Sequence, residues 1–301
     1  MNNVSRLEKF KVKWFSISGI GRILWIVARF VILVGLCFTI IYPFLVKIID
    51  SFKSFEDYLD PAVEYIPKYF TLNNIKTVLS QMKYKKTLIA TFAYSTLIGL
   101  IQVAVCSLVG YGLARFKFKG NKLIFALVIL QLLVPPQTLM IPLFIRFRFF
   151  YGNINLIGTY APGIVLAITG LGIKNGLYIF MFRQFFKNMP MELEDSAYVD
   201  GCNTFRTFYK IMLPNAVSLM VTIFLFSFSW QWTDSIYSKI FMRGTGLIAN
   251  MLAYVDGGEE EVMAIAFNNT AAVAAIIPIA LVYIIGQKFF IQSLERSGIT
   301  G

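Results

Sequence analysis

The segment between residues 188 and 214 contains acidic residues followed by a glycine, an order that is typical of the beginning and the end of a helix. Pro190 suits the first turn of a helix, where its missing N–H costs nothing. Three carboxylates then occupy the first turns and favour the positive end of the helix dipole: Glu192, Glu194 and Asp195. Gly201 is expected to end this helix, because glycine enters the left-handed conformation at little cost.

A second short helix is predicted directly after that glycine. Asn203 or Thr204 has the side chain needed to cap its N-terminus, and Pro214 separates it from the apolar segment that follows. The segment is therefore predicted to be a helix, a glycine elbow and a second helix. Such a rigid projection is suited to docking into the cleft of a partner protein.

Side chains for catalysis are scarce in this chain. There is no histidine, which excludes imidazole metal sites, histidine general bases and Ser-His-Asp triads. The cysteines at 37, 106 and 202 lack metal-ligand spacing, and residues 170–176 do not form a phosphate-binding Gly-x-x-x-x-Gly-Lys-Ser/Thr loop. We therefore predict no catalytic residue, no metal and no cofactor, and ATP hydrolysis would have to come from another chain.

The composition indicates a membrane protein. Hydrophobic residues make up 57% of the 301 residues and charged residues only 15%, too few to cover a soluble globule of this size. The net charge of +12 could indicate nucleic acid, but the basic residues lie between apolar runs and not in one stripe. We interpret them as anchors beside anionic lipid at the inner face of the bilayer, and expect no nucleic-acid partner.

Six apolar segments are long enough to cross a bilayer, which predicts an all-α integral membrane protein with six transmembrane helices. They are residues 23–46, 88–114, 123–143, 160–182, 213–232 and 271–290. The first is too long for a signal-peptide core and is expected to be retained. Prolines at 135, 136 and 142 should break the third, and the glycines of the second and fourth should serve helix packing or act as hinges.

Basic residues predict the orientation. They concentrate in the N-terminal segment and in the connections 115–122 and 183–210, which indicates cytoplasmic N- and C-termini; Arg146 and Arg148 are the discordant pair. The expected organisation has four parts. They are an amphipathic cytoplasmic segment or loosely ordered tail at 1–22, the first span and a long external loop at 23–87, a core of five spans at 88–292 with the loop 188–214, and a cytoplasmic tail at 293–301.

The loop 188–214 resembles the cytoplasmic loop of inner-membrane permeases of binding-protein-dependent ABC importers. That loop reads Glu-Ala-Ala, three residues, Gly, nine residues, Ile, one residue, Leu-Pro. Asp195-Ser196-Ala197 takes the first position here, with Asp and Ser replacing Glu and the first Ala, and the later positions match. The resemblance implies the type I ABC importer permease fold, with an ATPase contact made by Glu194, Asp195, Ser196, Ala197, Asp200, Gly201, Phe205, Ile211, Leu213 and Pro214.

Other stretches resemble the maltose-type carbohydrate subgroup of that family. They are residues 110–120, 134–142, 182–186 and 228–234. The resemblance implies a sugar importer in a bacterial cell membrane. Its partners would be a second, non-identical permease, two ATPase subunits, an extracytoplasmic sugar-binding protein and the lipid bilayer.

A sugar pathway would need aromatic platforms and hydrogen-bonding side chains inside the apolar segments. The candidates are Gln131, Lys174, Asn175, Trp230, Gln231, Trp232 and Asp234. Polar groups within a bilayer are costly unless they face water or a partner, so the alternative for the first three is hydrogen bonding between helices or pairing with the other permease. Membrane anchoring is the alternative for the tryptophans.

Two other functions remain open from the sequence. An ABC importer permease for a peptide, a polyamine or a metal complex would have the same loop. A secondary transporter would need no ATPase, but it would leave the helix–glycine–helix loop without a role. A membrane-embedded enzyme is disfavoured, because the predicted spans contain no cluster of nucleophiles, acids or metal ligands.

Overall fold

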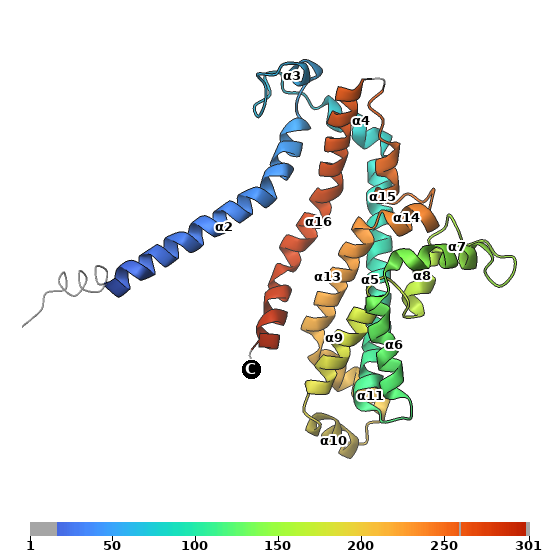
Figure 1. Ribbon diagram of the computed structural model, residues 1–301. Helices are drawn as coiled ribbons and strands as arrows, with labels where there is room; N and C mark the ends of the chain where they lie inside the picture. Colours follow the sequence, from blue (N-terminus) through green and yellow to red (C-terminus); the bar gives the residue numbers. More distant parts are fainter. Residues whose placement is uncertain (1–16, 259, 299–301) are drawn as a thin grey trace, which may run out of the picture. The chain divides into compact units, whose positions relative to one another are not determined.

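The computed structural model describes residues 17–258 and 260–298, and within these ranges the regular structure is helical (Figure 1). An isolated bridge between Phe150 and Ile154 is the one β-type pairing in the described part of the chain. The chain divides into two compact units. One comprises residues 1–75 and 257–273, and the other comprises 76–256 and 274–301.

Three of the six predicted spans are uninterrupted helices. They are α2 (Ile17–Asp50), α5 (Tyr84–Arg115) and α16 (Glu261–Gly298), and each extends beyond the bounds predicted for it. All three are long and apolar enough to cross a membrane. Residues 1–16 of the predicted amphipathic segment and 299–301 of the predicted tail lie outside the described residues.

The predicted third span is sharply bent. α6 (Asn121–Leu133) is followed by the 3₁₀ turn η1 (Pro136–Leu139) and by α7 (Met140–Arg148), and the two halves meet at 100°. Val134 is extended, as the residue before a proline prefers, so the helix ends there. The predicted break is confirmed at Pro135 and Pro136, whereas Pro142 is accommodated in the first turn of α7.

The predicted fourth span is not one helix. α8 (Ala161–Ile168) and α9 (Asn175–Asn188) are separated by residues 169–174. Gly170 and Lys174 have φ angles of 73° and 66°, and a left-handed residue at each position ends regular helix. In the described residues, the helices therefore supply three candidate spans, or five if each bent pair counts as one, and six continuous spans are not found.

The predicted fifth span begins later than expected. α11 (Thr204–Thr207), the π-helical turn η2 (Phe208–Met212) and α12 (Leu213–Asn215) lead into α13 (Val217–Thr233), with a bend of 78°. Pro214 lies directly before this bend, so the boundary predicted there is confirmed. The apolar helix starts at Val217 and not at residue 213. The remaining elements are α3 (Phe55–Leu59), α4 (Asn73–Gln81), α10 (Glu192–Val199), α14 (Ile236–Phe241), α15 (Ile248–Met251) and η3 (Leu252–Tyr254).

The smaller unit is held by polar contacts at the C-terminal end of α2. Asn269 of α16 accepts a hydrogen bond from Lys47 at 2.6 Å and donates one to Asp50 at 3.0 Å. Asp50 also forms an ion pair with Lys53 at 2.9 Å, and both side chains are nearly buried. In α3, the carboxylate of Asp57 accepts backbone hydrogen bonds from Ser54, Lys68 and Tyr69.

The larger unit is built around α5, which packs against α8, α9 and α13 (Figure 1). Gly110 marks the closest approach between α5 and α9. A Cβ atom built on it would lie 2.6 Å from Cβ of Phe182 and 3.0 Å from the backbone nitrogen of Arg183. The two helices can therefore approach this closely only because position 110 has no side chain.

We predict that Gly110→Ala lowers the apparent unfolding temperature of the purified protein in detergent. The added methyl group must push α9 away from α5, and overpacking of this kind costs about 1–3 kcal/mol. Gly112→Ala is the matched control, because its Cβ would meet nothing closer than a Phe116 ring carbon at 3.8 Å. Equal stability of the two variants would contradict the close contact.

Candidate functional site

The segment 188–214 forms the predicted helix, elbow and second helix, which we call the projection. It lies beyond the lower end of α9 in Figure 1, where α10 is labelled. Gly201 has a φ of +76°, and two hydrogen bonds close the end of α10 around it: Gly201 N–H to Tyr198 C=O at 3.0 Å and Cys202 N–H to Ala197 C=O at 2.9 Å. This pair of bonds is a Schellman motif, the usual helix end at a left-handed glycine.

The second helix of the projection begins at the predicted cap. The side chain of Asn203 accepts a hydrogen bond of 2.8 Å from the backbone N–H of Arg206, whereas Thr204 is the first helical residue. The predicted acidic first turn of α10 is also present, in the order Glu192, Glu194 and Asp195. Local sequence therefore accounts for the backbone of the projection.

The surface of the projection is apolar as well as acidic. Val199 is 87% exposed and Phe205 69% exposed, and Tyr198 and Tyr209 are also open to solvent. Of the predicted ATPase-contact residues, the exposed ones are Asp195, Ser196, Asp200, Gly201, Phe205 and Pro214. Ile211 and Leu213 are half-buried. Exposed aromatic and aliphatic side chains grouped in this way are typical of a protein interaction site.

Two members of the same predicted set face inward. Glu194 is 4% exposed and Ala197 is 1% exposed, both on the side of α10 that packs against the rest of the chain. The carboxylate of Glu194 lies 3.5 Å from the guanidinium of Arg115 at the end of α5. Neither side chain is available to a partner in this structure.

An aromatic cluster fixes the base of the projection. The ring of Tyr111 in α5 lies 5.6 Å from that of Phe186 in α9 and 4.9 Å from that of Phe208 in η2, measured between centroids. Phe186 and Phe208 also contact each other edge to face. The projection is therefore packed against two helices of the core, and its exposed side remains free to contact other proteins.

A buried polar network holds the break between α8 and α9. The amide of Gln102 in α5 donates to Asn175 Oδ1 and to the carbonyl of Ile173, and its oxygen accepts from the hydroxyl of Ser227 in α13. Asn175 also donates to the carbonyl of Ala167 at 3.5 Å. Gln102, Asn175 and Ser227 are almost completely buried, so one side chain joins three segments of the core.

Sequence reasoning identified Asn175 in this network but missed Gln102, to which Asn175 bonds directly, and Ser227, which bonds to Gln102. Gln102 is the single amide side chain in α5, which was the available signal, whereas Ser227 is one of several hydroxyl residues in α13 and offered none. Gln131 has a smaller role in the same region, donating to the carbonyl of Gly170 at 3.3 Å. The alternative of bonding within the chain thus describes both Gln131 and Asn175 in this structure.

Lys174 and Trp230 form a pair. The ammonium group lies 4.7 Å from the centroid of the indole ring, and Trp230 is 44% exposed. Such a cation–π contact offsets part of the cost of placing a lysine near apolar surroundings. These two predicted pathway residues, distant in sequence, are brought together by α9 and α13.

Trp232 and Asp234 have structural contacts. Trp232 is 3% exposed, and its indole N–H donates to the carbonyl of Ala275 at 2.9 Å, so it does not present a free aromatic face. The carboxylate of Asp234 accepts from the backbone N–H groups of residues 236, 237 and 238, which caps α14. The residues predicted to line a sugar pathway therefore lie in quite different environments.

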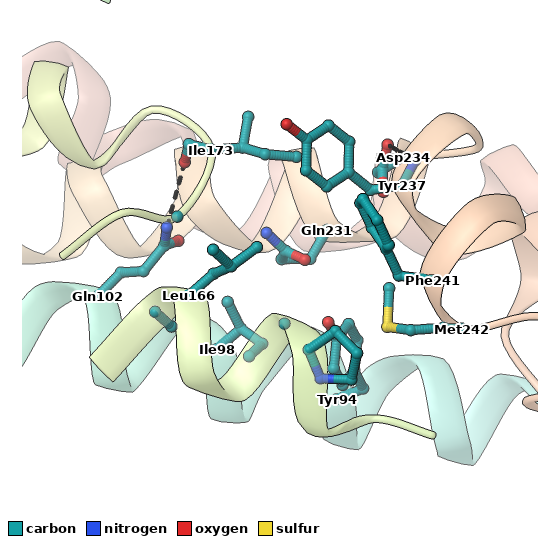
Figure 2. A pocket seen from close by; sticks show the side chains of 14 residues that line it. Tyr94, Ile98, Gln102, Leu166, Ile173, Gln231, Asp234, Tyr237, Phe241 and Met242 are labelled. Atoms are coloured by element: carbon teal, nitrogen blue, oxygen red, sulfur yellow. Dashed lines mark hydrogen bonds between the residues drawn. The ribbon is translucent and has the colours of Figure 1, made fainter. Parts of the chain in front are cut away.

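Gln231 and Asp234 line a small cavity with Tyr94 and Gln102 (Figure 2). Its volume is about 20 Å³, which is room for a water molecule and far too little for a sugar. The hydroxyl of Tyr94 has no hydrogen-bond partner among the described residues and lies against Gly163, where a side chain would collide with it. In this conformation the cavity does not form an open route.

We predict that Gln102→Leu destabilises the protein in detergent by about 1–3 kcal/mol, because Asn175 Oδ1 and the Ser227 hydroxyl lose a buried partner. The measurement is the apparent unfolding temperature. Gln131→Leu is the control, since this half-buried amide makes one hydrogen bond of 3.3 Å, and its effect should be smaller. A larger fall of the unfolding temperature in Gln131→Leu than in Gln102→Leu would show that the Gln102 network does not stabilise the break between α8 and α9.

Comparison with known proteins identifies the family. The family described as "Binding-protein-dependent transport system inner membrane component" matches residues 106–296, which is well over half of the chain and includes the whole projection. The chain belongs to this family. The resemblance inferred from the loop 188–214 is thereby confirmed.

Several relatives of this inner membrane component are sugar permeases. The chain is 26% identical over 275 residues to the arabinooligosaccharides transport system permease protein AraQ of Halalkalibacterium halodurans, covering 88% of this chain and 93% of the relative. It is 27% identical to the alpha-glucoside transport system permease protein AglG of Rhizobium meliloti, covering 78% of this chain and 62% of the relative.

A solved structure shares the fold. It is a crystal structure of a bacterial ABC transporter involved in the import of the acidic polysaccharide alginate, with a TM-score of 0.69 and 19% identity over 96% of this chain and 100% of the other. The all-helical ABC importer permease architecture is thus confirmed. This chain is a multi-pass protein of the cell membrane. The members of its family are components of transport systems and not catalytic enzymes.

Proposed function

We propose that this chain is a permease subunit of an ATP-driven ABC importer for a carbohydrate and forms half of the translocation pathway. The observation that carries the proposal is the family match over residues 106–296 together with relatives named for arabinooligosaccharides, alpha-glucosides and starch degradation products. The substrate class is accordingly an oligosaccharide or glycoside. A second permease, a non-identical homologue, supplies the other half.

The projection is the contact for the ATPase subunits in this proposal. Its exposed apolar side chains, Val199 and Phe205 foremost, lie beside the exposed carboxylates Asp195 and Asp200, a surface suited to a protein partner. Glu194 and Ala197 act from beneath by holding α10 in place. Two separate ATPase chains supply the hydrolysis, and an extracytoplasmic binding protein delivers the sugar.

The finer topology is also part of the proposal. Six crossings result if α8 and α9 together count as the fourth span and the bent pairs as the third and fifth. Both termini are then cytoplasmic, in keeping with the basic connections at 115–122 and 183–210. Residues 1–22, 23–87, 88–292 and 293–301 keep the roles expected from sequence.

The pathway residues belong to the same proposal, with different functions. Lys174 and Trp230 offer a cation and a partly exposed aromatic face to a sugar, and Gln231 and Asp234 lie beside a cavity that must widen for passage. Gln131, Asn175 and Trp232 support these groups from within the chain through their hydrogen bonds.

Gentle purification of the chain from its native membrane tests the assembly. An ATPase, a second permease and a sugar-binding protein are expected in the same complex. In proteoliposomes, this complex should take up labelled oligosaccharide only with ATP inside the cytoplasmic compartment and the binding protein outside. Uptake by the isolated chain along an ion gradient would refute the proposal, and uptake of peptides or polyamines in place of sugars would refute the substrate class.

We predict that Gly201→Val uncouples ATP hydrolysis from uptake while the chain still inserts. The space around Gly201 is open, so the strain comes from the left-handed backbone, at roughly 1–2 kcal/mol for a residue with a Cβ atom. Gly201→Asn should retain more uptake, because asparagine tolerates this conformation. The control is Gly246→Ala, where the space is equally open and φ is not positive. Wild-type uptake in Gly201→Val would contradict a role for the left-handed conformation of Gly201 in coupling.

We predict that Cys202 reacts with a membrane-impermeant maleimide in inside-out vesicles stripped of peripheral proteins, and not in intact cells. This thiol is partly exposed within the projection, whereas Cys106 is buried, and Cys37 lies within α2, which is proposed to cross the bilayer. Cys202→Ser is the control and should abolish the labelling. Labelling of Cys202 from outside intact cells would reverse the proposed orientation.

A further inference from the structure

Arg115, the last residue of α5, holds the start of the projection at three points. Its guanidinium donates to the carbonyl of Met189 at 2.8 Å and contacts the sulfur of Met191 at 2.6 Å. The third contact is the ion pair with Glu194 at 3.5 Å. Met189 follows the last residue of α9, and Met191 precedes α10. The Arg115 side chain therefore contacts both the turn between these helices and the first turn of α10.

The ion pair is buried. The Arg115 and Glu194 side chains are 6% and 5% exposed, and neither Arg115 Nε nor Glu194 Oε1 makes a hydrogen bond among the described residues. Burying two charges has a desolvation cost that their attraction seldom exceeds, and apolar residues of similar size often hold a fold as well. Stability alone therefore does not account for this pair.

Other residues of α5, located before Arg115 in the sequence, make further contacts with the core. Tyr111, one turn before Arg115, packs between Phe186 and Phe208, and Gly110 lets α5 approach α9 most closely. Gln102 lies thirteen residues before Arg115, which is about 20 Å along a helix. There it bonds to Asn175 and Ser227 at the break in the fourth span.

We propose that Arg115 is a positioning residue that fastens α10 to α5, so that movement of the projection is carried along α5 to the Gln102 network. This inference rests on the proposed function, in which ATPase subunits move the projection. A continuous helix is suited to the task, because its backbone hydrogen bonds make it rigid along its length. Energy used at the ATPase would thus reach the break beside Lys174 through Arg115.

The test is Arg115→Leu in the reconstituted complex, with ATP hydrolysis and oligosaccharide uptake measured on the same proteoliposomes. ATPase subunits should still copurify, because the exposed side of the projection is unchanged. Uptake per ATP hydrolysed should fall, because movement of α10 is no longer carried to α5 through Arg115. Lys117→Leu, an exposed basic residue two positions further on, is the matched control and should couple as the wild type does.

A second variant separates coupling from folding. Arg115→Leu combined with Glu194→Leu leaves no unpaired buried charge and should assemble even if the single variant does not. Because the bond to the Met189 carbonyl is still missing, its uptake per ATP should also remain low. Wild-type coupling in either variant would overturn the proposal.

Loss of the ATPase from the complexes, or failure of both variants to assemble, would assign Arg115 to docking or folding and would also overturn it. The proposed function fails in a different way. In that case the wild-type chain itself would carry no ATPase, whatever the variants do.

Discussion

The hydrogen bonds of Gln102 are the interaction on which the core of this protein depends. A chain that leaves helical geometry inside a bilayer must satisfy its polar groups internally, because lipid offers no partner. Between α8 and α9 the chain does this through Gln102, Asn175 and the carbonyl of Ile173. Ser227 joins α13 to the same amide, so the break and three helices are held by one side chain.

The projection shows the opposite arrangement, with polar and apolar groups turned outward. Its backbone is determined locally by the Gly201 helix end and the Asn203 cap. Its orientation is determined by the core, through Arg115 and the aromatic contacts of Tyr111. A rigid base and an exposed surface are what the proposed transfer of movement from a partner into the membrane requires. They explain why an exposed residue such as Val199 and a buried one such as Ala197 lie within one turn of each other.

Breaks in the helices mark the limit of span prediction from hydropathy. Apolar composition located helical elements in each predicted segment, and the break in the third was predicted from its prolines, but the fourth was predicted as one span across residues 169–174, where the helix ends. Pro135 and Pro136 gave a sequence signal for the first break, since proline lacks a backbone donor. The break at 169–174 includes left-handed Lys174, a conformation that a lysine adopts only because the surrounding structure imposes it.

The sequence by itself determined the membrane character, the family and the helix–elbow–helix form of the projection. Composition, glycine, proline and capping residues act over a few neighbouring positions, so no distant contact is needed to interpret them. Only the tertiary structure decided that Glu194 and Ala197 face inward and that Trp232 is buried and hydrogen-bonded within the chain. It alone also decided that Arg115 and Gln102 link segments that are distant in sequence. Burial and pairing depend on which helices meet, and a spacing of seventy or more residues between partners leaves no local pattern.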